Sequence, residues 1–218
     1  MASILAQYFE AWMRGLSVTL QLASIIWVAG LTGGAALAML SRRWQRVGMT
    51  VRVFSFVLSG VPILVLLFWF HYPAQQALGA VIDPFWTACF VLTVVNIAAV
   101  EQVVTSTWRS LPREFFDAAR VCGLSPRIIL RRIEVPLLLR QLIGPLLLSQ
   151  VVMLHMTLFA SLISVDEIFR MAQRINAEVY RPVEVYSLLG IFFLAVSLPL
   201  NAAALYLRRR YSRDLSER

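Results

Sequence analysis

Polar side chains that could do chemistry are few in this chain, and they lie inside long apolar runs. The candidates are Asn96, Glu101, Gln102, His155, Met156, Thr157 and Ser161. A carboxylate or imidazole in hydrocarbon is costly, so by default it indicates a functional site such as a substrate pathway. No nucleophile–base pair or H-E-x-x-H run accompanies these residues, which argues against an intramembrane enzyme.

Each of these residues also has a purely structural interpretation. Glu101 could lie shallow enough to be hydrated, or could pair with an arginine such as Arg109. His155 could be a neutral histidine bonded to a neighbouring helix. The amide of Asn96 could bond across helices, an interaction of about 0.6–2 kcal/mol in a membrane. The sequence alone leaves both interpretations open.

The elements that position these side chains are predicted to be membrane-spanning helices. Hydrophobic residues make up 59% of the chain and charged residues only 15%, whereas a soluble domain carries roughly 25% charged residues. A span needs about 20 mostly apolar residues. The fold class is therefore an all-α polytopic membrane protein, with five spans predicted near residues 17–40, 53–72, 84–108, 137–165 and 185–207. Pro62, Pro145 and Pro199 are expected inside spans, where neighbouring helices can satisfy the freed carbonyls.

Orientation follows from arginine, because the chain has no lysine. Four arginines lie in 41–52, seven in 109–140 and five in 208–218, which leaves four elsewhere. The positive-inside rule then predicts an external N-terminus and a cytoplasmic C-terminus. Residues 1–14 are expected to form an interfacial helix on the outer side, and residues 212–218 a cytoplasmic tail.

The net charge of +8 is interpreted as contact with anionic lipid. On so apolar a chain, cytoplasmic arginines are expected to face the bilayer surface, and no nucleic-acid partner is predicted. Cys89 and Cys122 have no partner at metal-ligand spacing. Both are expected to be unpaired packing residues, and no metal site is predicted.

The segment after the third predicted span reads SLPREFFDAARVCGLSPRIILRRIEVPLLL from Ser110 to Leu139. Ser110 and Pro112 can start a helix that Gly123 ends, and Ser125 and Pro126 can start a second. This segment has two interpretations. It could be an amphipathic linker on the inner leaflet. It could instead dock a cytoplasmic partner, with Phe115 and Phe116 as anchors and Ala118 and Ala119 allowing close contact.

Here the chain resembles a known family. Asp117-Ala118-Ala119, Gly123 and the run Ile133-Glu134-Val135-Pro136 are similar to the EAA…G…I-x-L-P coupling motif of permease subunits of bacterial ATP-binding-cassette importers. Asp117 stands in place of Glu and Val135 in place of Leu. The stretches 17–22, 161–167 and 181–186 resemble the polar amino-acid branch, which serves histidine, glutamine, arginine and opines. The resemblance covers roughly residues 15–211.

The resemblance implies a function and a set of partners. The chain would be a permease that moves a polar amino acid or its derivative across the bacterial inner membrane by alternating access. A second permease subunit, identical or different, would complete the pathway, and a periplasmic binding protein would deliver the substrate. An ATPase dimer would dock on a coupling helix at 112–123, with Phe115, Phe116, Asp117, Ala118, Ala119, Gly123 and Pro136 as the coupling residues.

The chain itself is not expected to be an enzyme. It has no G-x-x-x-x-G-K-[ST] phosphate loop, so ATP would be bound by the partner subunit, and no cofactor is expected here.

The sequence also departs from the family pattern. The usual R-G-T-P loop is Ser59-Gly60-Val61-Pro62, Gln102 stands where a Glu is usual, Thr105 replaces an arginine and Met156 replaces an acid. Either the second permease chain binds the substrate, or the substrate is unusual.

Two rival transporter classes are less consistent with the sequence. A methionine or osmolyte importer does not fit the R-P-V-E-V-Y stretch. An ATP-independent secondary transporter often shows internal repeats, and none is visible here.

Overall fold

The computed structural model is a bundle of helices, and it describes residues 1–216. Residues 217–218 of the expected tail lie outside the described part. The elements are α1 Ala2–Gln7, α2 Phe9–Arg43, α3 Gln45–Gly60, α4 Ile63–His71, α5 Pro73–Leu78, α6 Pro84–Arg109, α7 Arg113–Val121, α8 Pro126–Ile129, the π-helix η1 Leu130–Glu134, α9 Val135–Met156, the 3₁₀-helix η2 Thr157–Ile163, α10 Ile168–Val179 and α11 Pro182–Ser216. The described residues contain no strand, so the all-α class is confirmed.

Four helical stretches are long and apolar enough to cross a bilayer. They are α2, α6, the continuous run from α8 to η2, and the part of α11 up to Leu207. The bent pair of α3 with α4 and α5 brings the number to five if it counts as one span. The predicted count of about five is therefore confirmed. Pro145 lies inside α9 and Pro199 inside α11, as expected.

The predicted second span, 53–72, is not one helix. α3 ends at Gly60 and α4 begins at Ile63, and the chain turns by 95° between the two halves of the pair. Proline has no N–H and disfavours the helical region for the residue before it. Val61, which precedes Pro62, is accordingly extended, with φ −101° and ψ 124°. Pro62 thus breaks the helix inside which we expected it to lie.

The expected helix at 1–14 is also divided differently. α1 ends at Gln7, and α2 runs without a break from Phe9 through the first span. Ile4 and Trp12 are buried in a cluster with residues of α10 and α11. No Gly-Pro or Asn-Gly breaker occurs between Phe9 and Ser17, so the helix continues.

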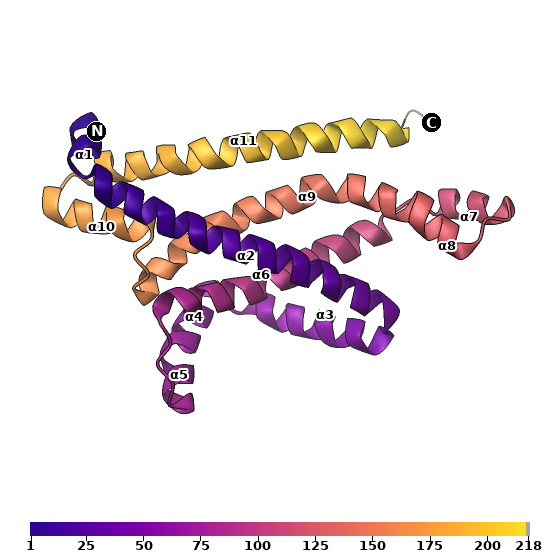
Figure 1. Cartoon of the computed structure of the whole chain (residues 1–218), viewed down its shortest axis with the longest axis horizontal. Coiled ribbons are helices and arrows are strands. Elements are labelled where there is room, and N and C mark those ends of the chain that lie inside the picture. The colour runs from indigo at the N-terminus through magenta and orange to yellow at the C-terminus, as the bar shows by residue number, and fades with distance from the viewer. Residues whose placement is uncertain (217–218) are drawn as a thin grey trace.

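The two ends of the bundle differ in charge. The N-terminus, α1 and α10 lie toward one end, whereas α7, α8, the α2–α3 turn and the C-terminal end of α11 lie toward the other (Figure 1). The three arginine-rich segments therefore gather at one end. This arrangement agrees with the predicted orientation, which stays a prediction.

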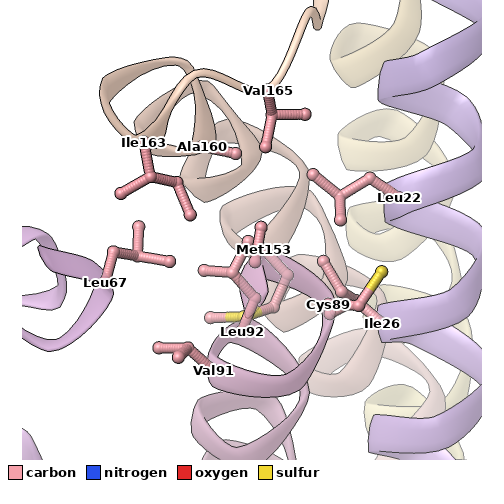
Figure 2. Packing of buried hydrophobic residues seen from close by; sticks show 11 residues of the cluster. Leu22, Ile26, Leu67, Cys89, Val91, Leu92, Met153, Ala160, Ile163 and Val165 are labelled. Atoms are coloured by element: carbon pink, nitrogen blue, oxygen red, sulfur yellow. The ribbon is translucent and has the colours of Figure 1, made fainter. Parts of the chain in front are cut away.

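The main apolar core forms where α2, α4, α6, α9 and η2 meet (Figure 2). Its members include Leu22, Ile26, Leu67, Leu92, Met153 and Ile163. Cys89 is buried in this core and unpaired, as expected. Cys122 is also unpaired but exposed, so its predicted packing role is wrong.

Candidate functional site

The segment between α6 and α9 forms two short helices joined at a glycine. α7 follows Pro112, and α8 begins at Pro126, as the sequence predicts. Gly123 has φ +73°, a left-handed backbone conformation that residues other than glycine rarely adopt. Its N–H donates to the carbonyl of Arg120 at 2.9 Å. Gly123 therefore ends α7 as a left-handed cap.

The predicted coupling residues divide between two faces of α7. Phe116 packs against an apolar cluster that includes Leu111 and Leu138, and Ala119 is buried. Phe115, Ala118 and Gly123 are exposed, and exposed Asp117 bonds to Arg120. Three large apolar side chains of this segment are also exposed: Phe115 early in α7, Val121 at its end and Leu124 just after Gly123. The helix is therefore held by one face and presents a second, partly apolar face to its surroundings.

Pro136, the last predicted coupling residue, lies in the first turn of α9. It follows the π-helix η1, whose wider turn is closed by the N–H of Val135 bonding to the carbonyl of Leu130. A proline cannot donate to the carbonyl four residues earlier, here that of Arg132. This missing bond favours the wider turn. Pro136 itself is exposed, and its predicted coupling role stays a prediction.

A cavity of about 480 Å³ opens at the arginine-rich end of the bundle, between α2, α3 and α6. Its lining residues are Ala38, Ser41, Arg42, Gln45, Gly48, Met49, Arg52, Glu101, Thr105, Trp108, Arg109 and Glu134. The side chain of Glu101 is almost fully buried and accepts a hydrogen bond from Thr105 at 3.0 Å. Gln102 is exposed and lines an adjoining hollow.

The alternative in which Glu101 pairs with Arg109 is not realised. Both residues line the same cavity, but no ion pair between them occurs in the described chain. Glu101 therefore presents a carboxylate to a cavity that three arginines also line.

Asn96 adopts its structural alternative. It is fully buried, and its amide donates to the carbonyl of Ile26 in α2 and to the side chain of Gln150 in α9, both at 2.9 Å. The amide of Gln150 returns a bond of 3.3 Å. The pair joins three spans. Gln150 is not among the residues singled out from the sequence. Its available signal was the same as that of Asn96, an amide inside a predicted span.

The four candidates around His155 do not line the Glu101 cavity. His155 is exposed on the outside of the chain, with its ring 5.6 Å from that of Phe193 in α11. Met156 is half-buried. Thr157 and Ser161 are buried, and their hydroxyls donate to the carbonyls of Leu154 and Leu158. The structure thus separates these residues from Glu101.

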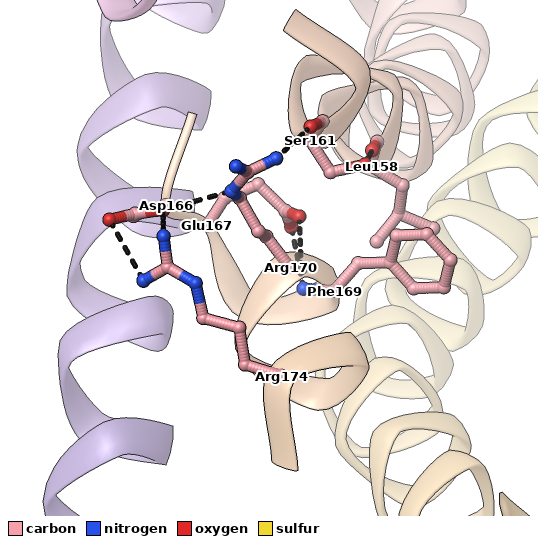
Figure 3. Close-up of polar contacts among 7 residues, drawn as sticks. All are labelled: Leu158, Ser161, Asp166, Glu167, Phe169, Arg170 and Arg174. Atoms are coloured by element: carbon pink, nitrogen blue, oxygen red, sulfur yellow. Dashed lines mark hydrogen bonds and ion pairs between the residues drawn. The ribbon is translucent and has the colours of Figure 1, made fainter. Parts of the chain in front are cut away.

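At the opposite end, charged residues fix the start of α10 (Figure 3). Asp166 pairs with Arg170 at 3.1 Å and with Arg174 at 2.8 Å. Arg170 also donates to the carbonyl of Ser161 at 2.9 Å. These contacts join η2 to α10.

Glu167 is fully buried beside this group. It caps α10 by accepting bonds from the N–H groups of Phe169 and Arg170, both at 2.8 Å. Burial raises the pKa of the Glu167 carboxyl to about 7, against the opposing effect of the two hydrogen bonds and the Arg170 charge. The sequence places Glu167 in the stretch 161–167 and carries no signal that its side chain is buried.

Comparison with known proteins covers nearly the whole chain. Residues 4–213 match the model of the family described as "Binding-protein-dependent transport system inner membrane component". The octopine transport system permease protein OccM of Rhizobium meliloti is 30% identical over 199 residues, which cover 87% of this chain and 81% of that protein. The glutamine transport system permease protein GlnP of Escherichia coli K12 is 27% identical over 193 residues, 85% of this chain and 88% of that one.

A solved structure has a similar fold. The crystal structure of an amino acid ABC transporter with histidines contains a chain that superimposes with a TM-score of 0.86 and 21% identity. The match covers 94% of this chain and 96% of that one.

Proposed function

The chain belongs to the family of binding-protein-dependent transport system inner membrane components, and on that premise we propose that it is the permease subunit of an ATP-binding-cassette importer for a polar amino acid or amino-acid derivative. It is a multi-pass protein of the inner membrane. The observation that supports the proposal most is the family match over 4–213, combined with relatives named for octopine and glutamine transport. A methionine or osmolyte importer is the alternative.

The exposed face of α7 is the proposed docking site for the ATPase. Exposed apolar side chains clustered at one spot mark interaction sites, and aromatic side chains often anchor such interfaces. Phe115 and Ala118, three positions apart, are exposed on one side of α7, and Val121 and Leu124 are exposed beside the Gly123 turn. The ATPase is proposed as a separate dimer that binds the ATP, so this chain acts without a cofactor of its own.

The other proposed partners follow from the same architecture. A second permease chain, identical or different, would pack beside this one to complete the pathway. A periplasmic binding protein would deliver the substrate at the end that carries α1 and α10. On this chain, the cavity that holds Glu101 supports a role in lining the pathway, since a buried carboxylate facing a cavity can bind a cationic group.

The first test of the proposed function is purification of the tagged chain in mild detergent from the cell that makes it. We expect an ATPase subunit to co-purify in stoichiometric amount. Reconstituted into vesicles with a binding protein, the complex is expected to take up a radiolabelled amino acid or octopine only when ATP is supplied. Purification of the chain without any ATPase would contradict the proposal.

A second test addresses the docking face. Phe115→Asp places a charge in the proposed apolar contact, and loss of a central aromatic anchor typically costs 2 kcal/mol or more, which is about a 30-fold loss of affinity. We expect the ATPase to be lost on purification while the chain still inserts. The matched control is Val81→Asp, which puts the same charge on a fully exposed residue in the α5–α6 connection. Equal ATPase recovery from both variants would contradict this docking site.

A further inference from the structure

Three side chains from three separate helices meet at the arginine-rich end of the bundle. Arg42 lies at the end of α2, Trp108 near the end of α6, and Glu134 at the end of η1, next to α9. Arg42 forms an ion pair with Glu134 at 2.6 Å. The indole N–H of Trp108 donates to the same Glu134 carboxylate oxygen. The Arg42 guanidinium lies over the Trp108 ring, 3.7 Å from its centroid. We call these three residues the Glu134 cluster.

The ion pair of this cluster differs from most others in the described chain. Most of them join residues no more than eight positions apart. The exceptions are Arg42–Glu134 and the link of the Met1 amine to Glu184 at the opposite end. The Glu134 side chain is only 14% exposed. A bond to an ionised group is roughly twice as strong as a neutral one, so this partly buried carboxylate joins the helices firmly.

The position of Glu134 along the chain matters as much as its contacts. It follows α7, the glycine turn and α8, and it lies at the end of the π-helix that precedes Pro136. Short π-helical turns occur often at functional sites. Along the backbone, a displacement of α7 and α8 reaches Glu134 before it reaches α9. Through space, Phe116 of α7 also packs against the cluster that holds Leu138 of α9. At Glu134 the moving segment is bonded to the ends of α2 and α6.

We propose that Glu134 is a positioning residue for transport, which holds the ends of α2 and α6 to the base of α9 so that a push on α7 moves three spans together. This inference rests on the proposed function, because only a docked ATPase would displace α7. Without the Glu134 carboxylate, the ATPase would still hydrolyse ATP, but the ends of α2 and α6 would follow α9 less closely, because only contacts farther along the spans, such as the Asn96–Gln150 pair, would still join them. Hydrolysis and uptake would then become uncoupled.

The experiment measures ATP hydrolysis and uptake in the same vesicles, with the complete complex of permease, ATPase and binding protein. The probe is a radiolabelled mixture of L-amino acids and octopine. For Glu134→Gln we expect hydrolysis within about twofold of wild type and uptake per ATP lowered about tenfold or more, because a charge-assisted pair is replaced by weaker neutral bonds. Trp108→Phe keeps the ring under Arg42 but removes the N–H donor, so a smaller loss of about two- to fivefold is expected.

The matched control is Arg43→Gln. It removes a charge from the exposed residue next to Arg42 at the same end of the bundle, where it makes no ion pair among the described residues, and it should leave uptake per ATP unchanged. If Glu134→Gln does not accumulate, Trp108→Phe and Arg42→Lys decide the question. Arg42→Lys keeps the charge but loses the planar group that stacks on the indole.

The outcomes separate this inference from the proposed function. Loss of the charged pair should weaken the link between the helices. The role of Glu134 would therefore be overturned if Glu134→Gln kept uptake per ATP within about twofold of wild type. The same holds if both Trp108→Phe and Arg42→Lys kept it. Proportional loss of hydrolysis and uptake would also overturn it, because that result indicates damage to the whole complex. Uptake by the wild type without ATP would instead overturn the proposed function, and this inference with it.

Discussion

Replacing Gly30 by alanine tests the polar junction between α2, α6 and α9. A Cβ at Gly30 would lie 2.2 Å from the side-chain nitrogen of Asn96 and 2.8 Å from its Cβ. Both separations are shorter than van der Waals contact allows. Asn96 has no free space to move into, because it is fully buried and bonded to Ile26 and Gln150. The added methyl must therefore displace the asparagine or separate the helices.

The size of the effect follows from three contributions. Overpacking a well-packed site costs about 1–3 kcal/mol. Displacing Asn96 breaks three interhelical bonds, each worth about 0.6 kcal/mol in a membrane protein. Alanine gains back up to about 1 kcal/mol over glycine within a helix. We therefore expect Gly30→Ala to lower the free energy of unfolding by about 2–4 kcal/mol.

The assay is reversible unfolding of the purified chain in mixed detergent micelles, followed by circular dichroism. The matched control is Gly190→Ala in α11, where a Cβ would meet nothing within 4 Å. This control should be neutral or stabilising by up to about 1 kcal/mol. Equal stabilities of the two variants would refute the reasoning. So would an unchanged penalty for Gly30→Ala in an Asn96→Ala background. Removal of the amide takes away the two shortest contacts and leaves only the one to the Cβ of residue 96, at 2.8 Å, so the penalty should fall.

Two further predictions concern protonation and topology. The pKa of Glu167 is about 7 in the fold against an ordinary 4.5, so the stability that it contributes is complete below pH 4.5 and is lost as the pH rises through 7. This loss is about 3 kcal/mol at most. In Glu167→Gln the thermal unfolding midpoint should therefore depend less on pH between pH 5 and 8 than it does in the wild type. An equally steep pH dependence in the variant would contradict the assignment. Cys122 is exposed and Cys89 buried, so a membrane-impermeant maleimide should label Cys122 in inside-out vesicles and neither cysteine in intact cells. Labelling of Cys122 from outside would reverse the predicted orientation.

The sequence predicted the features that depend on local chemistry. The start of α7 after Pro112, its end at Gly123 and the start of α8 at Pro126 follow from residues whose backbone preferences are strong and short-ranged. The span count follows from apolar runs whose length must match the bilayer.

Features that depend on which helices meet could not be predicted. The role of Asn96 required knowing that Ile26 and Gln150 lie beside it, 70 and 54 positions away. The Glu134 cluster likewise joins residues that no local pattern connects. The bend at Pro62 was missed for a different reason, because proline is often tolerated inside a span when neighbouring helices satisfy the backbone. Whether it kinks or breaks the helix depends on what the next segment packs against.

The bend between α3 and α4 also bears on the order in which the protein is made. α4 has nine residues and is about 14 Å long, less than half of the bilayer core, so neither half of the pair is a full span alone. In the finished fold α4 packs against α6 and η2, and its Leu67 is buried among residues that include Ile163 (Figure 2). Within this cluster, Ile163 is synthesised about ninety positions after α4. The contact between α4 and η2 therefore forms only after the fourth span has been synthesised.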